Sequence, residues 1–312
     1  MKPLRVQIDL SPEQLEAREK LKEAVLKNPL PQRFLSRHPE AEAIVAANPA
    51  QFRQILERQE KCLSCKGLDF CVQPIRGQVV QPELDQSGSI VEIFCPCKFA
   101  RQERDEYRYT DNYRFFHGSR EDQKILLENF SLQGESQEYT QAYIAVTQST
   151  MNGRGLFLWG KPGSGKTYLL RAAANAFCKQ GKEVSFVNMP LLVQALKENL
   201  KDDVFRQARM ADLMHSDVLF LDDIGSESIT RWTRNEILFP VLEYRMNHKL
   251  PTYFSSNYKA DELEKHYVIP SEAMSAVEAK RLLERVLALA APVKVAGESR
   301  RHKGQIRPED VS

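Results

Sequence analysis

The sequence lacks any apolar run that approaches the roughly 18 residues needed to cross a membrane as a helix. Its first residues, Met1 to Gln7, also lack the apolar centre of a secretory signal peptide. A strong charge of either sign is missing too, because 44 lysines and arginines face 42 aspartates and glutamates. We therefore expect a cytoplasmic protein without a membrane partner, in which any basic surface for nucleic acid is local.

The composition gives no sign of disorder or of a collagen-like repeat. Hydrophobic residues make up 42% and charged residues 28% of the 312 residues, which is typical of globular proteins. This length is enough for about two domains. We therefore expect two folded domains.

Cysteine is scarce outside one short segment, since five of the six cysteines lie between Cys62 and Cys97. A reducing cytosol disfavours disulfides, so a metal site is the leading explanation and a redox or incidental cluster is the alternative. The sequence Cys62-Leu63-Ser64-Cys65 is followed by Cys71 and then by Cys95-Pro96-Cys97. Two such pairs can supply four thiolates to a structural, tetrahedral Zn²⁺ ion with no position left open for catalysis. We expect Cys62, Cys65 and Cys95 as ligands, with Cys97 as the fourth and Cys71 as its alternative.

The segment before these cysteines is polar and has a helical pattern. Ser11-Pro12-Glu13-Gln14 predicts a capping box with proline at the first helical position, and the helix should run to about Lys27. Further prolines at positions 29, 31, 39 and 49 divide the chain into short helices. Between the cysteine pairs, Val79-Val80 and Ile90 to Phe94 indicate two short strands. Residues 1–105 are therefore predicted to form a small helical, zinc-binding domain.

Residues 106–130 mix aromatic and charged side chains. Tyrosines and phenylalanines alternate here with arginines, and such a segment could bind single-stranded nucleic acid by stacking and phosphate contacts. Six acidic residues between Lys98 and Lys124 favour instead a charge-balanced linker between domains, whose aromatic side chains pack against its neighbours. We predict that this linker joins the domain of residues 1–105 to a second domain of residues 131–312.

The most informative stretch is Gly160-Lys161-Pro162-Gly163-Ser164-Gly165-Lys166-Thr167, which fits the pattern G-x-x-x-x-G-K-[ST]. It follows the apolar run Leu156 to Trp159, typical of a buried parallel strand, and precedes a helical pattern from Tyr168 to Lys179. In this context the glycines let backbone N–H groups cradle phosphate oxygens at a helix N-terminus. Lys166 should reach the β- and γ-phosphates, and the Thr167 hydroxyl should hold Mg²⁺. The predicted nucleotide site comprises this whole stretch and Tyr168.

From about Lys124 the pattern alternates between helix and strand, which predicts a parallel α/β sheet. Further strands are expected at residues 184–187, 218–221, 252–255 and 293–295. Asp222-Asp223 ends one of them, and the carboxyl ends of parallel strands border the ligand crevice. Asp222 should hold Mg²⁺ through water, and Asp223 should orient or deprotonate the attacking water. Asn257, after the next strand, could contact the γ-phosphate or the lytic water, and a simple turn explains it equally well.

Basic residues gather near the end of the sequence. Arg281 and Arg285 lie on a predicted helix of residues 275–290, and Arg300 and Arg301 follow it. An arginine inserted into the site of a neighbouring subunit could stabilise charge during phosphoryl transfer. A solvated basic surface explains each arginine equally well.

These motifs together resemble those of AAA+ ATPases, and more narrowly those of the bacterial replicative helicase loaders of the DnaC/DnaI/IstB group. The residues that carry the resemblance are Gly160 to Thr167, Leu219 to Gly225, Phe254 to Asn257 and Gly297 to His302. The resemblance covers nearly the whole chain, and the cysteine-rich front half favours DnaI-type loaders over IstB-like transposition helpers. The implied fold class is α/β, an AAA+ P-loop NTPase domain with a parallel sheet, preceded by the small helical zinc-binding domain.

The resemblance also implies a role for each matching position. The residues that would bind the phosphates and Mg²⁺ and act on the attacking water are the Walker A residues Lys166 and Thr167, the Walker B pair Asp222 and Asp223, and the sensor 1 residue Asn257. The matching arginines are the arginine finger, Arg285, and the nucleotide-binding sensor 2, Arg300 or Arg301. The helices expected between residues 190 and 215 match an insertion that lines a DNA path. The Walker B pair is Asp-Asp here instead of Asp-Glu, and the resemblance to other helicase loaders includes this feature. It implies weak ATP hydrolysis that a partner or DNA stimulates.

The cofactors implied by the resemblance are ATP, Mg²⁺ and Zn²⁺. The front domain would bind a hexameric, DnaB-type replicative helicase and mask the ATPase domain, which would bind single-stranded DNA; other primosome proteins are further implied partners. The family pattern has a histidine among its zinc ligands, but this chain has none between Cys71 and Cys95, so a cysteine must substitute. The expected function is an ATP-dependent loader that places the helicase on DNA in replication initiation or restart. The alternatives are a nucleotide-gated adaptor with negligible hydrolysis and an IstB-like transposition helper.

Overall fold

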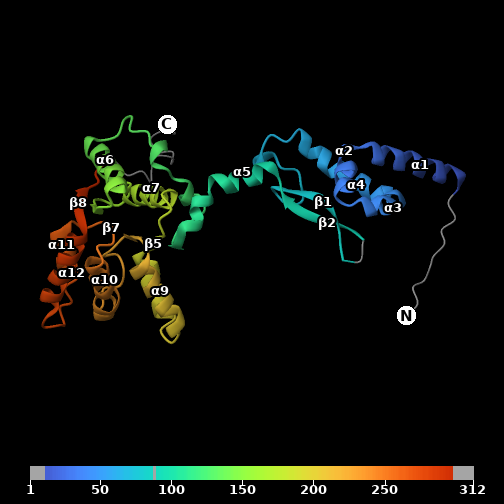
Figure 1. Ribbon diagram of the computed structural model, residues 1–312. Helices are drawn as coiled ribbons and strands as arrows, with labels where there is room; N and C mark the ends of the chain where they lie inside the picture. The colour runs from blue at the N-terminus through green and yellow to red at the C-terminus, as the bar shows by residue number, and fades with distance from the viewer. Residues whose placement is uncertain (1–10, 87–88, 298–312) are drawn as a thin grey trace, which may run out of the picture. The chain divides into compact units, whose positions relative to one another are not determined.

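The computed structural model describes residues 11–86 and 89–297. The chain divides into two compact units, of which the first ends at Glu106 and the second begins at Tyr107 (Figure 1). No helix of the described residues is long and apolar enough to span a bilayer. The first unit contains one cluster of buried apolar residues and the second contains two.

Prolines begin most of the helices of the first unit. These helices are α1 (Pro12–Lys27), α2 (Pro29–Arg37), α3 (Glu42–Ala47), α4 (Pro49–Leu63) and α5 (Lys98–Glu106), with short 3₁₀ turns at Pro39–Ala41 and Leu68–Phe70. Proline is favoured in the first turn because the N–H that it lacks has no partner there. The predicted capping box is confirmed, since Ser11 N donates to Gln14 Oε1 over 2.9 Å and Gln14 N donates to Ser11 Oγ over 3.3 Å.

A hairpin of β1 (Gln78–Leu84) and β2 (Ile90–Pro96) completes the first unit. The two strands pair antiparallel, which confirms the strands predicted between the cysteines. Helix α4 joins the helices to this hairpin, because Gln51 Nε2 donates to Ile90 O over 3.1 Å. The buried residues of the shared core are Val25, Phe34, Ala41, Val45, Phe52 and Ile90. A small apolar cluster therefore holds helices and hairpin together.

The second unit is built on a parallel sheet of six strands in the order β3-β5-β6-β7-β4-β8. The strands are β3 (Tyr113–Phe116), β4 (Gly155–Trp159), β5 (Val184–Asn188), β6 (Val218–Asp222), β7 (Thr252–Ser256) and β8 (Ala290–Lys294). Strands β4 to β8 confirm the five apolar runs expected to be strands, although β8 begins earlier than predicted. Because β7 lies between β6 and β4, the carboxyl ends of these three strands meet at one edge of the sheet.

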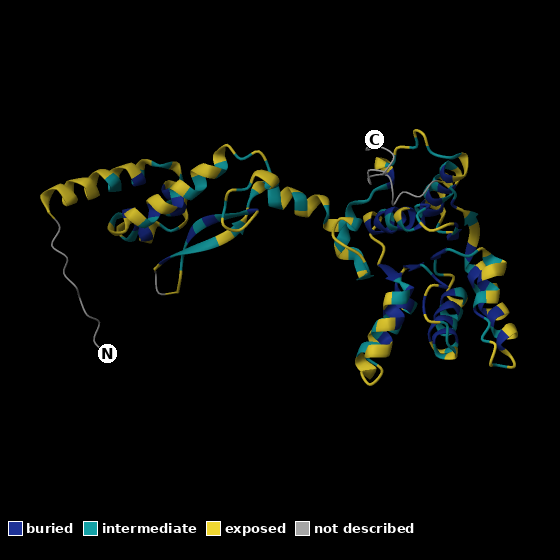
Figure 2. Ribbon diagram, turned by 180° about the vertical axis from the view of Figure 1, so that it is seen from behind, coloured by how far each residue is buried: buried dark blue, intermediate teal, exposed yellow. Residues whose placement is uncertain are grey.

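Helices cover both faces of this sheet. One face carries α6 (Gln137–Asn152) and α7 (Lys166–Lys179); the other carries α8 (Met189–Glu198), α9 (Asp203–His215), a π-helical segment (Trp232–Leu238), α10 (Phe239–Asn247), α11 (Ala260–His266) and α12 (Ser275–Leu289). Successive side chains of a strand point to opposite faces. Leu158 and Phe220 therefore pack with α6 and α7, whereas Phe157 and Leu221 pack with the other group. Burial on both faces explains the continuous apolar runs, which are dark blue in Figure 2.

The predicted linker of residues 106–130 is wrong, because from Tyr107 this segment belongs to the second unit and supplies the edge strand β3. Tyr113 and Phe116 pack on the core beside α7, and the Tyr113 hydroxyl donates to Asn175 Oδ1 over 2.6 Å. Three 3₁₀ turns, Arg108–Asn112, Asp122–Lys124 and Leu127–Asn129, continue the segment along α7. Aromatic side chains of this segment therefore pack on the core, whereas Arg114 is exposed. The alternation of charged and aromatic residues in the sequence did not show which side chains would be buried.

A buried arginine ties the helices of the second unit to the sheet. Arg245 of α10 is fully buried and donates to carbonyl oxygens of Leu213 (3.1 Å), Ser216 (2.9 Å) and Pro251 (2.8 Å). These carbonyls lie at the end of α9 and just before β7, and the bonds to the Leu213 and Ser216 carbonyls are buried. Burial lowers the pKa of Arg245 to about 9, which leaves the side chain charged at neutral pH.

We expect Arg245→Leu to lower the free energy of unfolding of the second unit by about 3–5 kcal/mol, because several buried carbonyl oxygens lose their donor. Urea denaturation followed by circular dichroism measures this loss. Arg154→Leu is the control, since Arg154 is exposed, and it should change stability far less. Equal losses in the two variants would contradict the structural role given to Arg245.

Candidate functional site

The loop between β4 and α7 has the backbone that its glycines allow. Gly163 and Gly165 have φ angles of +83° and +97°, a left-handed region that favours glycine. Gly160 is required for a different reason, because a Cβ there would lie 2.1 Å from the Val295 carbonyl oxygen. The chain after β8 can therefore lie against the loop, with Val295 N donating to Trp159 O over 2.8 Å. The predicted strand, loop and helix follow one another without a break, and a glycine loop that ends at a helix N-terminus is an arrangement that suits phosphate oxygens.

Lys166 lies inside this loop and is 7% exposed. Its Nζ donates to Gly160 O over 2.8 Å, to Lys161 O over 3.0 Å and to Asn257 Oδ1 over 2.9 Å. The Ser164 hydroxyl is buried and has no hydrogen-bond partner among the described residues. An ammonium group and an unpaired buried hydroxyl in one loop fit the oxygens of a phosphate chain.

Asp222 ends β6 as a buried carboxylate that is 3% exposed. Its Oδ1 accepts hydrogen bonds from Thr167 Oγ1 over 2.9 Å and from Ser255 Oγ over 2.6 Å. Burial raises the pKa of Asp222, and these two hydrogen bonds oppose the shift. A carboxylate beside a hydroxyl at the N-terminus of α7 is an oxygen donor set that suits Mg²⁺, and a cation there would favour the charged carboxylate.

Asp223 and Asn257 are joined by a hydrogen bond at the same edge. Asn257 Nδ2 donates to Asp223 Oδ1 over 3.1 Å while Asn257 Oδ1 accepts from Lys166. Asp223 has a φ of +62°, which is unusual for a residue other than glycine, and its N–H donates to Ser255 Oγ over 2.9 Å. Asn257 therefore links the loop after β4 to the end of β6, an arrangement that favours a role in the site over a simple turn.

A cavity of about 570 Å³ opens at this edge of the sheet. The residues expected there that line it are Pro162, Gly163, Gly165, Lys166, Thr167, Tyr168, Asp222, Asp223 and Asn257. Three lining residues were not predicted from the sequence, namely Arg171, Asn188 and Ser255. Arg171 lies four residues after Thr167 and so on the same face of α7, a spacing that could have identified it. Asn188 is paired with Asp222 across β5 and β6, which only the strand register reveals.

Of the arginines predicted for this site, only Arg285 lies within the described residues. Arg285 of α12 is not among the residues that line it. Its Nε instead donates to Glu243 Oε2 over 2.5 Å, and its guanidinium lies 4.0 Å from the centre of the Phe239 ring. Arg300 and Arg301 lie outside the described residues. The described part of the site therefore carries its positive charge on the loop and on α7.

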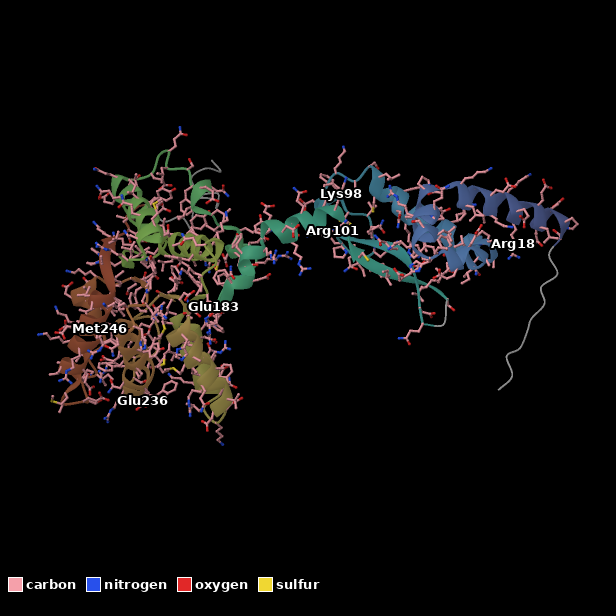
Figure 3. All side chains as sticks on the ribbon, viewed as in Figure 1. Arg18, Lys98, Arg101, Glu183, Glu236 and Met246 are labelled. Atoms are coloured by element: carbon pink, nitrogen blue, oxygen red, sulfur yellow. The ribbon has the colours of Figure 1, made fainter. Side chains whose placement is uncertain are left out.

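The cysteines of the first unit are all free thiols, and four of them line one cavity of about 300 Å³. These are Cys62, Cys65, Cys71 and Cys97, whereas Cys95 is not among the lining residues. Lys98 and Arg101, labelled in Figure 3, follow Cys97 and line the same cavity.

Backbone amides point at two of these sulfur atoms. Gly77 N donates to Cys71 Sγ over 3.4 Å, and Ala100 N donates to Cys97 Sγ over 3.4 Å. The first of these bonds is the main reason that the pKa of Cys71 is lowered. Within residues 11–86 and 89–297, however, no three histidine, cysteine or acidic side chains stand in a group that could hold a metal ion. The shared cavity gathers the thiols, but it does not arrange them as a formed metal site.

Comparisons with known proteins agree with the nucleotide-site geometry. Residues 102–307 match the family of the IstB-like ATP binding protein. The chain is 30% identical over 292 residues to the replicative helicase loader DnaI of Bacillus subtilis (strain 168), covering 91% of this chain and 93% of that protein. It is 25% identical over 146 residues to the replicative helicase loader DnaC of Escherichia coli (strain K12), which covers 46% of this chain and 59% of that protein. A crystal structure of DnaI superposes with a TM-score of 0.52 at 30% identity, covering 62% of this chain and all of that one.

We expect Lys166→Ala to weaken ATP binding by about 100-fold or more, because the phosphate chain loses a charge-assisted donor in a buried loop. Isothermal titration calorimetry with Mg²⁺ measures the affinity. Lys182→Ala removes an exposed lysine beyond the other end of α7 and should leave the affinity unchanged. An unaltered affinity in Lys166→Ala would show that the loop does not hold the phosphates.

Proposed function

Because the chain belongs to the IstB-like ATP-binding proteins, and among them to the family of the replicative helicase loader DnaI, we propose that it is an ATP-dependent helicase loader. It would bind a hexameric, DnaB-type replicative helicase and help to place it on single-stranded DNA. The observation that carries this proposal is that the match to the loader extends over 91% of the chain and so includes the cysteine-rich first unit. A likeness confined to the second unit would support only an ATP-binding domain.

The residues of the second unit supply an ATPase site in this proposal. The loop amides, Ser164 and Lys166 bind the phosphates, while Thr167 and Asp222 hold Mg²⁺. Bound Mg²⁺ would neutralise charge on the phosphate oxygens as the terminal phosphate is transferred to water. Asp223 orients that water or accepts its proton, and Asn257 positions Asp223 relative to Lys166.

Hydrolysis should be slow without a partner, because hydrogen bonds and the backbone hold Asp223 in one position. Its Oδ1 accepts hydrogen bonds from both Asn257 Nδ2 (3.1 Å) and Ser226 Oγ (2.9 Å). The backbone at φ +62° also holds the side chain at the end of β6 in a strained position. Contact with the helicase or with DNA would relieve this restraint and stimulate turnover.

Arg285 would act only between subunits. It lies outside the cavity of its own chain and is paired with Glu243. In an assembly, the guanidinium would leave this pair to reach the nucleotide of a neighbouring subunit, where it would stabilise developing charge. Single-stranded DNA would bind the second unit near α8 and α9, which form the insertion between β5 and β6.

A nucleotide-gated adaptor is the second candidate, and the restrained Asp223 favours it. Asp223→Asn separates the two functions, because it keeps the side chain's shape and removes the base. We expect this variant to bind ATP and helicase normally, to lose ATP hydrolysis and to load the helicase on circular single-stranded DNA at least about tenfold more slowly. Unchanged loading would favour the adaptor.

The wild-type chain and Lys166→Ala are the reference proteins in that loading assay. The wild type should load the helicase only with ATP, and Lys166→Ala should not load it with or without ATP. Failure of the wild type to bind the helicase would contradict the loader function itself. Binding to a transposase instead would support the IstB-like transposition helper.

The first unit would be stabilised by a structural Zn²⁺ ion on Cys62, Cys65, Cys71 and Cys97. Their common cavity and the amide hydrogen bonds to Cys71 and Cys97 support this ligand set. This proposed set differs from the expected one, because it omits Cys95, an expected ligand, and includes both Cys97 and Cys71, which were expected as alternatives for the fourth position. The thiolates would have to draw together around the ion, and binding would then add to the stability of the unit.

Cys71→Ser and Cys95→Ser test this ligand set in the full chain. We expect the wild type and Cys95→Ser to carry about one zinc ion per chain and Cys71→Ser to lose most of it, because a serine hydroxyl is a poor zinc ligand. Metal content by mass spectrometry and the shift of the unfolding temperature on chelation are the measurements. Loss of zinc in Cys95→Ser with retention in Cys71→Ser would reverse the assignment.

A further inference from the structure

Arg171 is a second basic side chain at the cavity of the second unit. It lies on α7 four residues after Thr167, and it lines the cavity together with Thr167 and Asn188. Residues four apart share one face of a helix, and their side chains tilt toward the helix N-terminus. The Arg171 guanidinium is therefore directed along α7 toward the end where Thr167 meets Asp222. Asn188, the residue opposite Asp222 in the strand register, lies at the same end.

The guanidinium is held there by one carboxylate and is not fully satisfied. Arg171 Nη1 donates to Asp122 Oδ1 over 2.5 Å. The guanidinium also lies 5.9 Å from the centre of the Phe186 ring in β5. Arg171 Nε is buried and has no hydrogen-bond partner within the described residues. A guanidinium has five N–H donors in a planar fork, so it can bind a second anion without leaving the first.

Asp122 is itself fixed to the same helix. Its Oδ2 accepts from Ser119 N over 2.8 Å and from Ser119 Oγ over 2.9 Å. The fully buried Asn175 of α7 donates through Nδ2 to Asp122 O over 3.0 Å and to Ile125 O over 2.8 Å. This anchored carboxylate balances the charge of Arg171 when no phosphate is near. The side chains of Arg171 and Asp122 are 26% and 18% exposed, so solvent screens the pair only in part.

We propose that Arg171 binds the terminal phosphate of ATP and that Asp122 is its partner when that phosphate is absent. This inference rests on the proposed function of the site as an ATPase. The γ-phosphate brings negative charge that ADP lacks to the end of the cavity where Thr167, Asp222 and Asn188 meet. Arg171 responds to that charge by sharing or exchanging its contact with Asp122, so it makes the site prefer ATP over ADP. Lys166 and Arg171 then contact the phosphate chain from the loop and from the next turn of α7.

The test compares ATP and ADP affinities by isothermal titration calorimetry on the full chain with Mg²⁺. Arg171→Met keeps an unbranched apolar side chain at this position and removes the charge. It should weaken ATP binding about tenfold and leave ADP binding within about twofold, since a charge-assisted hydrogen bond to the γ-phosphate is lost. Asp122→Asn should strengthen ATP binding roughly threefold relative to ADP, because Arg171 no longer has a competing anion.

A second ion pair provides a matched control. Lys179 Nζ lies 2.6 Å from Glu128 Oε1 and joins the same helix to the same segment, but neither residue lines the cavity. Lys179→Met and Glu128→Gln should leave the ATP-to-ADP affinity ratio unchanged. A ratio that changes as much in these variants as in Arg171→Met would overturn the inference, because it would reflect the packing of α7 alone.

The remaining outcomes separate this inference from the proposed function. Equal losses of ATP and ADP affinity in Arg171→Met, or an unchanged ratio, would make the Arg171–Asp122 pair purely structural and leave the ATPase proposal standing. If Arg171→Met does not fold, the ratio in Asp122→Asn decides the question, and an unchanged ratio overturns the inference. A wild-type chain that binds neither nucleotide would overturn the proposed function and this inference with it.

Discussion

Asp222 is the group on which the arrangement of the second unit depends, because a carboxylate that is only 3% exposed must have its charge supported from within the protein or by a cation. Burial raises its pKa, and hydroxyl donors on Thr167 and Ser255 oppose that shift. These donors come from α7 and from β7, which are distant in the sequence. The sheet order and the position of α7 across it bring both hydroxyls to the end of β6, where a Mg²⁺ ion could complete the compensation.

The side-chain amide of Asn257 connects the phosphate loop to the residue that follows Asp222. An amide can accept and donate at once, so Asn257 accepts from Lys166 and donates to Asp223. A phosphate that recruits the Lys166 ammonium must change the hydrogen bonding of Asn257 and therefore of Asp223. The pairing of Arg171 with Asp122 places a second cation in a comparable situation on the neighbouring turn of α7. Each cation is held by protein oxygens that an anionic ligand could replace, and Arg171 Nε still has no partner among the described residues, which is a property that a nucleotide-dependent switch would require.

The first unit has a different constraint, which is its small amount of buried apolar surface. Its core consists of a few helix side chains and Ile90 of the hairpin. Small units of this kind commonly need a covalent or metal cross-link to be stable. The cavity that gathers Cys62, Cys65, Cys71 and Cys97 lies between the end of α4, the hairpin and the start of α5. A zinc ion proposed for this cavity would cross-link the end of α4 to the start of α5.

The sequence by itself determined the features that depend on short-range pattern. The capping box at Ser11, the strands β4 to β8 and the loop of residues 160–167 were predictable because periodicity, caps and motif spacing act over a few residues. Only the tertiary structure decided which distant residues meet. Asp122 and Arg171 are 49 positions apart, and Arg285 and Glu243 are 42 apart. Cys71 lines the cavity of Cys62, Cys65 and Cys97 whereas Cys95 does not, and β3 joins the sheet instead of forming a linker. A single sequence records no contact between such positions, because the crossovers between strands bring them together only when the sheet has formed.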